Sequence, residues 1–389
     1  MYYKLSNLHL LTGKILESVL RTIPSNVTFF DLSHNKLGIK SRDEFSLIFS
    51  AIPINVTSLN LCRNKLGNKS AIELAQAFKH IPARVTSLDL SINDLGSKSG
   101  EELFLIFAAI PENVTILDLR GNDLCKRSGA ELAQSFKAIR SSVTFLDLSV
   151  NDLYQKGGDE LALIFAAIPS NVTSLDLSVN DLGSKSGDEL ALAFKAIPSN
   201  VISLNLLYND LSIRSKEELA QIFSAIPITV TSLDLSFNEL GSKSGDELAL
   251  AFKAIPTGVT SLDLCDNELE SLSIEELNKL NSALPTIHTI YLSQIELQKM
   301  SLQQRKALKE VFPNIKNVII SDKNEKLLGG NNLEACAFFA NKEGMSREPP
   351  SLKSMATFFV TQNKELNKYI SLLPRELQNF AENFVPFRT

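Results

Sequence analysis

The chain contains 389 residues, of which 44% are hydrophobic and 21% charged, and its formal net charge is -5. This acidic balance argues against a binder of nucleic acid or of anionic membranes, because both ligands select proteins with a basic face. The sequence also contains no apolar run near the roughly 20 residues that a membrane-spanning helix needs, so we expect no membrane insertion.

The N-terminal segment, residues 1–26, lacks the apolar core and cleavage site of a secretory signal. Its stretch LTGKILESVLRTIPSN has the spacing of an amphipathic helix and ends with Ile23 and Pro24, a pair that recurs further along the chain. We interpret this segment as an N-terminal cap, because the end units of a repeat array need a polar cover.

One motif returns every 29 residues from residue 27 onward. The copy VTSLDLSVNDL begins at Val172, and equivalent copies begin at Val27, Val56, Val85, Val114, Val143, Val201, Val230 and Val259. Two degenerate copies begin at Ile287 and Ile315. A fixed period of this kind is the signature of a repeat architecture. We therefore predict one array over residues 27–325, with nine good copies and two degenerate ones.

The first half of each copy predicts a short strand that ends at a buried asparagine. In one copy the apolar residues Val172, Leu175 and Leu177 alternate with polar ones, as a half-buried strand requires. The asparagines of the nine good copies are Asn35, Asn64, Asn93, Asn122, Asn151, Asn180, Asn209, Asn238 and Asn267. Stacked amide side chains can satisfy backbone groups where the chain leaves each strand, so we assign them a structural role. Ile295 stands at this position in the first degenerate copy.

The second half of each copy predicts a helix. Ser186 and Glu189 have the S-x-x-E spacing of a capping box, and Leu190 and Phe194 follow at helical spacing on the inner face. The same pair recurs at Ser41/Glu44, Ser70/Glu73, Ser99/Glu102, Ser128/Glu131, Ser215/Glu218, Ser244/Glu247 and Ser273/Glu276. Gly157 replaces the serine in the fifth copy, which predicts that the box is lost there.

Stacking such units dictates a curved array. Neighbouring strands lie about 4.8 Å apart, whereas packed helices need about 8–10 Å. The strands must therefore line the inside of the curve and the helices the outside. The expected fold class is α/β, a horseshoe-shaped solenoid with a parallel concave sheet and convex helices.

Residues 326–389 differ from the array in composition. GGNN at 329–332 and SREPP at 346–350 indicate breaks, and helical patterns lie between and after them. Two interpretations stay open, a helical cap over the last repeat or a small separate domain that binds a partner.

The repeat resembles the ribonuclease-inhibitor-like class of leucine-rich repeats over about residues 27–320, through its L-x-x-L-x-L-x-x-N-x-L pattern. Its wording VTSLDLSxNDLGSKSGDELALAFKAIP also resembles the leucine-rich repeat effectors that Legionella bacteria export by type IV secretion. The resemblance implies a protein made in the bacterial cytoplasm that acts in the cytoplasm of a eukaryotic host by binding a host protein. It also implies a C-terminal translocation signal, for which Phe387 is the candidate hydrophobic residue.

Carboxylates form a column on the expected concave face. The central exposed strand position holds Asp31, Asp89, Asp118, Asp147, Asp176, Asp234 and Asp263, with Asn60 and Asn205 in the gaps. A second column follows the asparagines, at Asp94, Asp123, Asp152, Asp181, Asp210, Glu239 and Glu268. Stacked carboxylates give the wall a negative field that would attract a basic partner surface. The alternative is that aspartate is simply the default residue of this repeat.

Exposed positions that depart from the repeat consensus are the candidate partner-binding residues, because the repeat itself does not dictate them. They are Phe29, His34, Arg63, Ile116, Arg120, Phe145, Leu207, Tyr208, Phe237 and Tyr291. Exposed aromatic residues and arginines are enriched in binding hot spots. We expect the partner to contact Arg120, Phe145, Leu207, Tyr208 and Phe237, near the middle of the wall. Sequence drift without function is the alternative for each residue.

The sequence suggests no catalytic residue, metal site or cofactor. Its four cysteines are scattered, its four histidines fall at different repeat positions, and its N-V-T and GSKSG stretches recur with the repeat. We expect a monomeric protein-protein interaction module that is not an enzyme. Two alternatives are a GTPase-activating protein of the leucine-rich repeat type and a ubiquitin-ligase substrate adaptor that uses residues 326–389.

Overall fold

The computed structural model describes residues 1–321 and 327–328. In this part of the chain one sheet contains 13 strands in chain order, of which β1 to β12 pair in parallel and β13 pairs antiparallel with β12. The strands are β1 (Tyr2–Lys4), β2 (Phe29–Asp31), β3 (Ser58–Asn60), β4 (Ser87–Asp89), β5 (Ile116–Asp118), β6 (Phe145–Asp147), β7 (Ser174–Asp176), β8 (Ser203–Asn205), β9 (Ser232–Asp234), β10 (Ser261–Asp263), β11 (Thr289–Ser293), β12 (Asn317–Ser321) and β13 (Leu327–Leu328).

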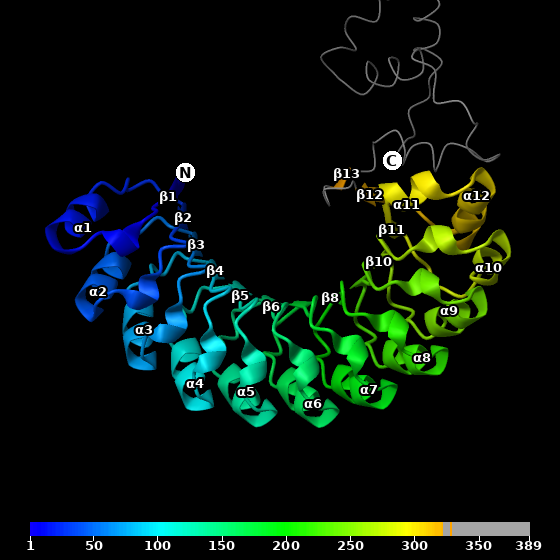
Figure 1. Cartoon of the computed structure of the whole chain (residues 1–389), viewed down its shortest axis with the longest axis horizontal. Coiled ribbons are helices and arrows are strands. Elements are labelled where there is room, and N and C mark those ends of the chain that lie inside the picture. Colours follow the sequence, from blue (N-terminus) through cyan, green and yellow to red (C-terminus); the bar gives the residue numbers. More distant parts are fainter. Residues whose placement is uncertain (322–326, 329–389) are drawn as a thin grey trace, which may run out of the picture.

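The strands line the inside of an arc and the helices its outside (Figure 1), which confirms the predicted horseshoe. The helices are α1 (Gly13–Leu20), α2 (Arg42–Ser50), α3 (Ala71–Phe78), α4 (Gly100–Ala108), α5 (Gly129–Phe136), α6 (Gly158–Ala166), α7 (Gly187–Lys195), α8 (Lys216–Ser224), α9 (Gly245–Phe252), α10 (Ile274–Lys279), α11 (Gln294–Lys299) and α12 (Leu302–Val311). A short 3-10 turn joins each strand to its helix in the good copies, as at Leu182–Ser184 in the copy of β7.

The core lies between the sheet and the helices. Strands β3 to β10 each contribute a buried leucine such as Leu175, and helices α2 to α9 each contribute a buried phenylalanine such as Phe194. The phenylalanines follow the array as one stack, at Phe49, Phe78, Phe107, Phe136, Phe165, Phe194, Phe223 and Phe252, and each is at most 1% exposed. A continuous core of this kind means that each repeat depends on its neighbours for stability.

The predicted asparagines form a hydrogen-bonded ladder through the core, which confirms their structural role. Oδ1 of Asn180 accepts from the backbone N–H groups of Asn151 (3.0 Å) and Leu153 (3.2 Å), one repeat earlier. Its Nδ2 donates to the carbonyl oxygens of Leu148 and Leu177, both at 3.1 Å. The amide therefore ties two consecutive repeats together where the chain turns away from the strand.

After Asn267, the last asparagine, a different residue occupies the ladder position. The repeat spacing predicts Ile295 there, but Ile295 is 40% exposed, and the buried residue is its neighbour Glu296. The two carboxyl oxygens of Glu296 accept from the backbone N–H groups of Asp266 and Leu269, both at 3.0 Å. The correction arises because helix α11 begins directly after β11 and presents the longer glutamate side chain to the turn.

The GSKSG stretch is explained by packing between repeats. The N–H of Gly183 donates to the carbonyl oxygen of Asn209 at 2.7 Å, and a Cβ on Gly183 would lie 2.2 Å from the carbonyl oxygen of Asp210. The side chain of Ser186 caps helix α7 together with Glu189, whose Oε1 also accepts from Gly158 of the preceding repeat. In the fifth copy the sequence predicts that the capping box is lost, but one of its two hydrogen bonds remains. Glu160 accepts from the N–H of Gly157 at 3.4 Å.

Residues 1–26 contain a strand as well as the predicted helix. Strand β1 pairs in parallel with β2, and the N–H of Leu8 donates to Oδ1 of Asn35 at 2.9 Å, as the first rung of the ladder. The N-terminal segment is thus built like a repeat. The helical patterns of residues 326–389, and Phe387 with them, lie outside the described residues.

Candidate functional site: the concave wall and its rim

The concave wall consists of regular side-chain rows that the strand register aligns. In β7 the first and third residues, Ser174 and Asp176, face the concave side, while Leu175 between them is buried. Parallel pairing places Ser174 beside Phe145 and Ser203, and Asp176 beside Asp147 and Asn205. We call these the first row and the acidic row. The residue two positions after each aspartate forms a third row, and the residue after that, which has a left-handed backbone conformation, forms the rim.

The structure distributes the predicted partner-binding residues over all of these rows. Phe29, Ile116 and Phe145 lie in the first row, where Ile116 is the direct register partner of Phe145. Tyr291 lies in the acidic row beside Asp263. By their repeat positions Arg120 and Leu207 belong to the third row, and His34, Arg63, Tyr208 and Phe237 belong to the rim, each with a φ between 53° and 59°.

The predicted central patch is therefore divided into separate groups. Ile116 and Phe145 form an apolar pair on β5 and β6. Tyr208 and Phe237 form another at the rim of the copies of β8 and β9, with ring centroids 6.4 Å apart. Arg120 belongs to the copy of β5, three strands away from Leu207 in the copy of β8. These residues share the concave side and belong to the copies of β5, β6, β8 and β9.

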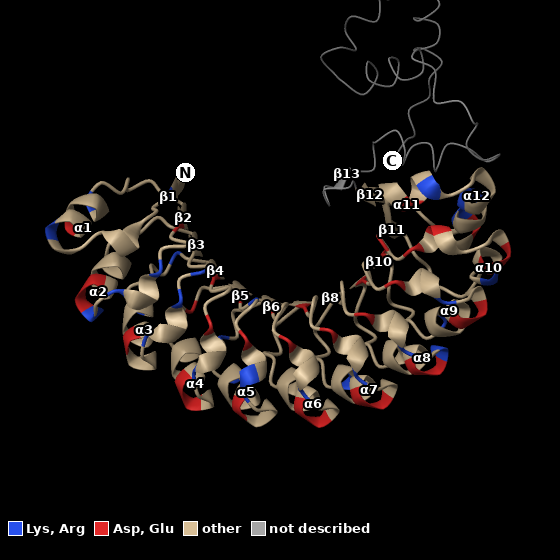
Figure 2. Cartoon of the chain, in the orientation of Figure 1, with Lys and Arg blue, Asp and Glu red and all other residues tan. Residues whose placement is uncertain are grey.

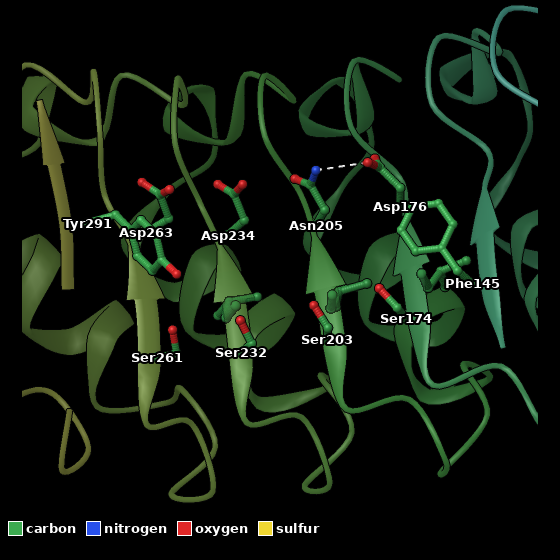
Figure 3. Close-up of a pocket in the computed structure, with 13 residues that line it drawn as sticks. Phe145, Ser174, Asp176, Ser203, Asn205, Ser232, Asp234, Ser261, Asp263 and Tyr291 are labelled. Carbon is green, nitrogen blue, oxygen red and sulfur yellow. Dashed lines mark hydrogen bonds between the residues drawn. The ribbon is translucent and has the colours of Figure 1, made fainter. Parts of the chain in front are cut away.

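A trough of about 320 Å³ crosses the concave wall between β6 and β11. Phe145 lies at one end and Tyr291 at the other, and the floor between them carries the first-row serines and the acidic row (Figure 3). Within the floor, Nδ2 of Asn205 donates to Oδ2 of Asp176 at 2.9 Å. The trough thus combines two aromatic ends with a floor of hydrogen-bonding groups.

The acidic row has a structural cause in the backbone. Oδ1 of Asp176 accepts from the N–H of Ser178 at 2.8 Å, and Oδ1 of Asn205 accepts from the N–H of Leu207 at 2.9 Å. The same bond recurs along the wall, for example at Asp118 and Asp147. Because the neutral amide of Asn205 accepts the same hydrogen bond, the backbone needs an oxygen acceptor at this position but not a negative charge.

Several members of the acidic row hold protons more tightly than a free aspartate. Burial, together with the neighbouring Asp147, raises the pKa of Asp118 to about 7. Burial and the neighbouring Asp263 raise the pKa of Asp234 to about 6, and burial raises those of Asp147 and Asp263. The wall carries acidic positions along the arc (Figure 2), but its field near neutral pH is weaker than the count of carboxylates predicts.

Asp31, at the N-terminal end of the same row, behaves in the opposite way. Burial alone would favour its neutral form, but hydrogen bonds from Lys4 and Ser33 lower the pKa of Asp31 to about 2. The Lys4 ammonium lies 2.9 Å from Oδ2 of Asp31. Lys4 could not be predicted from the sequence, because the consensus of the repeat is too weak in residues 1–26 to indicate strand β1.

Exchanging Asp118 and Asp31 separately for asparagine should have opposite effects on stability. Asp118→Asn keeps the acceptor for Arg120 N–H and removes repulsion between adjacent strands, so we expect about 1 kcal/mol of stabilisation above pH 7. Because the folded pKa of Asp118 is raised, its cost grows between about pH 4 and pH 7, and the gain should vanish toward pH 4. The measurement is urea denaturation over this pH range.

Asp31→Asn is the matched control for that substitution. The folded pKa of Asp31 is lowered, so its contribution is present above about pH 4 and is lost as the pH falls toward 2. We expect a loss of roughly 1–2 kcal/mol at pH 7, because the variant gives up a charge-assisted bond with Lys4. Equal effects of the two substitutions at pH 7 would contradict this account of the acidic row.

Groupings typical of metal sites or membrane segments are not found in the described residues. No cluster of three or more histidine, cysteine or acidic side chains that could hold a metal ion occurs in residues 1–321 and 327–328. None of the helices in this part of the chain is long and apolar enough to cross a membrane. In three of the four N-V-T stretches the asparagine donates to a carbonyl oxygen about 30 residues earlier in the chain, as Asn171 does to that of Ser141 at 2.7 Å.

Comparison with known proteins agrees with this architecture. The leucine-rich repeat family pattern matches residues 169–191 and 227–249. The crystal structure of the leucine-rich repeat-containing protein LegL7 of Legionella pneumophila is similar to the chain, with 41% sequence identity and a TM-score of 0.69. The match covers 87% of this chain and 96% of LegL7. The chain is a leucine-rich repeat protein.

Two further comparisons give no information about the function of this leucine-rich repeat protein. The structure of the Rad7 and Elc1 complex of yeast matches it with 14% identity and a TM-score of 0.39, over 69% of each chain. A similarity of this size carries no argument about function. No curated protein sequence matches the chain significantly.

Proposed function

We propose that this leucine-rich repeat protein is a bacterial effector that enters a eukaryotic host cell and binds a host protein on its concave wall. The main evidence for this binding surface is the trough between Phe145 and Tyr291. Aromatic side chains at the ends of a polar hollow are typical anchors for a protein partner. Leucine-rich repeat folds commonly serve protein-protein interaction, since their curved arrays present extended concave surfaces.

The effector role is supported by the similarity to LegL7 of Legionella pneumophila. It would place the protein first in the bacterial cytoplasm and then, after type IV secretion, in the host cytoplasm. A reporter enzyme fused to the N-terminus of the chain tests export during infection. We expect a signal in host cells from a strain with a working type IV system, no signal from a strain without one, and a reduced signal for Phe387→Ala.

The binding surface is tested by affinity purification from host lysate with the whole chain and two double variants. Phe145→Ala with Tyr291→Ala removes both ends of the trough, whereas Leu163→Ala with Leu192→Ala changes two exposed leucines on the convex helices. We expect the partner recovered by the wild type to be reduced at least about tenfold by the first pair and retained by the second. Equal recovery with both pairs would place the interaction elsewhere.

A further inference from the structure

A second hollow, which we call the rim pocket, lies beside the trough at the C-terminal ends of strands β8 to β11. It encloses about 270 Å³ and is lined by Tyr208, Phe237, Asp210, Glu239 and Glu268, among others. The side chain of Tyr208 is 54% exposed, and its ring centroid lies 6.4 Å from that of Phe237. Aromatic faces of this kind attract cations and cover the alkyl part of long basic side chains.

Three carboxylates of the rim pocket form no ion pair within the part of the chain that the structure describes. Asp210, Glu239 and Glu268 occupy the second acidic column in three consecutive repeats, and within residues 1–321 none of them forms an ion pair. Lys299 also lines the pocket, but its ammonium is held by Glu270 at 2.6 Å. The aromatic pair therefore lies beside carboxylates that have no cationic partner among residues 1–321. Asp210 lies against the carboxyl of Asp181, whose pKa is raised by burial and by this neighbour.

The same column shows elsewhere in the chain which group it binds. Four repeats earlier, the ammonium of Lys126 lies between two consecutive column carboxylates, 3.0 Å from Asp94 and 2.7 Å from Asp123. These hydrogen bonds raise the pKa of Lys126. Asp210 and Glu239 are the counterparts of Asp94 and Asp123, while the counterpart of Lys126 is the exposed Ser242.

The column also changes sign along the array. Its first two positions hold Lys36 and Lys65, with Arg63 beside them at the rim, whereas all positions from Asp94 to Glu268 are acidic. A basic segment would therefore be repelled by the first repeats and attracted by the later ones. This polarity gives a bound segment a preferred end of the horseshoe.

We infer that the rim pocket binds a lysine side chain from a basic, extended segment of a protein partner. The ammonium lies between Asp210 and Glu239, as that of Lys126 does between its own pair, and the alkyl chain packs on Tyr208 and Phe237. The inference rests on the proposed protein-binding function and adds to it a second contact surface with a defined chemistry.

The test uses the whole chain and a fluorescein-labelled octapeptide of alternating lysine and serine, followed by fluorescence anisotropy. The comparison peptide carries acetyl-lysine, which keeps the alkyl chain and removes the charge. We expect acetylation to weaken binding at least about tenfold, and Tyr208→Ala to weaken it several-fold. Binding should also fall as salt is raised, because the contact is exposed and ionic.

The decisive variant places a lysine of the chain itself in the rim pocket, at the position that corresponds to Lys126. Ser242→Lys keeps every ring and carboxylate of the pocket but places an ammonium where Lys126 lies four repeats earlier, and we expect binding to fall about tenfold. Ser184→Lys adds the same charge at an exposed counterpart position, next to Asp152 and Asp181, and should retain binding. Circular dichroism confirms that both variants are folded.

Three results would overturn the inference: equal binding of the acetylated peptide, wild-type binding by Ser242→Lys, or an equal loss with Ser184→Lys. The last would show a general charge effect in place of a pocket. Failure here is distinguishable from failure of the proposed function, because the purification described above depends on Phe145 and Tyr291. A host partner that is still lost with those two substitutions but is indifferent to Ser242→Lys leaves the trough as the binding surface and removes the rim pocket.

Discussion

Replacing Asn180 with alanine should lower the free energy of unfolding by on the order of 3–5 kcal/mol. The substitution leaves the backbone N–H groups of Asn151 and Leu153 without their acceptor in the core. The carbonyl oxygens of Leu148 and Leu177 each lose one donor and keep a second one, from Asn151 and Asn209. Each buried polar group without a partner costs about 1–3 kcal/mol. Each repeat is stabilised by its neighbours, so a weakened interface should let the repeats on its two sides unfold separately. We therefore expect unfolding in two stages.

Urea denaturation measures the loss, and hydrogen exchange of the Asn151 and Leu153 amides locates it. The matched control is Asn171→Ala, which removes one exposed bond to the carbonyl oxygen of Ser141. That variant should stay within about 0.5 kcal/mol of the wild type. A similar loss in both variants would show that the buried ladder contributes no more than an exposed loop contact.

The stability of the C-terminal repeats should decrease as the pH rises to about 8, and Glu296→Gln should remove this dependence. Burial, assisted by the nearby Glu270 and Asp266, raises the pKa of Glu296 to about 8. A carboxyl whose folded pKa lies above its unfolded value favours folding while it is protonated, and the benefit is lost between about pH 4 and pH 8. A shift of this size corresponds to roughly 3–5 kcal/mol, at about 1.4 kcal/mol per pH unit.

The interval from pH 7 to pH 8.5 is measured in an Asp118→Asn background, because Asp118, with a pKa of about 7, still titrates there, whereas Asp234, with a pKa of about 6, has largely lost its proton. Urea denaturation over this interval gives the slope, and hydrogen exchange at the amides of Asp266 and Leu269 reports on the ladder itself. Glu310→Gln, on the exposed side of α12, is the control and should keep the wild-type slope. A slope that persists in Glu296→Gln would assign it to another group.

The repeat made much of the fold predictable, because the same local pattern occurs in nine copies and each copy supports the others. The strand, the asparagine and the capped helix are encoded within one repeat, so short-range spacing was sufficient to predict them. Prediction failed where the pattern is degenerate. Strand β1 carries little of the consensus, and the ladder position of β11 moved from Ile295 to Glu296 because a helix replaces the usual turn.

Candidate site residues could be predicted from the sequence, but the residues that lie beside them in space could not. The sequence identified Phe145, Tyr208 and Phe237 as departures from the consensus, yet their division between the first row and the rim follows from strand register and left-handed backbone geometry. It also predicted a column of carboxylates that gives the wall a negative field, with the repeat consensus as the alternative. Burial and the repulsion between adjacent strands, which raise the pKa of Asp118, exist only once the strands are paired.

By itself, then, the sequence determined that this protein is a leucine-rich repeat solenoid, since the period, the alternation and the caps are local properties of each copy. Only the tertiary structure decided which carboxylates are ion-paired. Asp94 and Asp123 share the ammonium of Lys126, whereas Asp210 and Glu239 line a pocket with Tyr208 and Phe237 and form no ion pair within residues 1–321. The physical reason is that ion pairing and burial depend on which side chains meet across repeats, and residues that meet in this way lie some 29 positions apart in the chain.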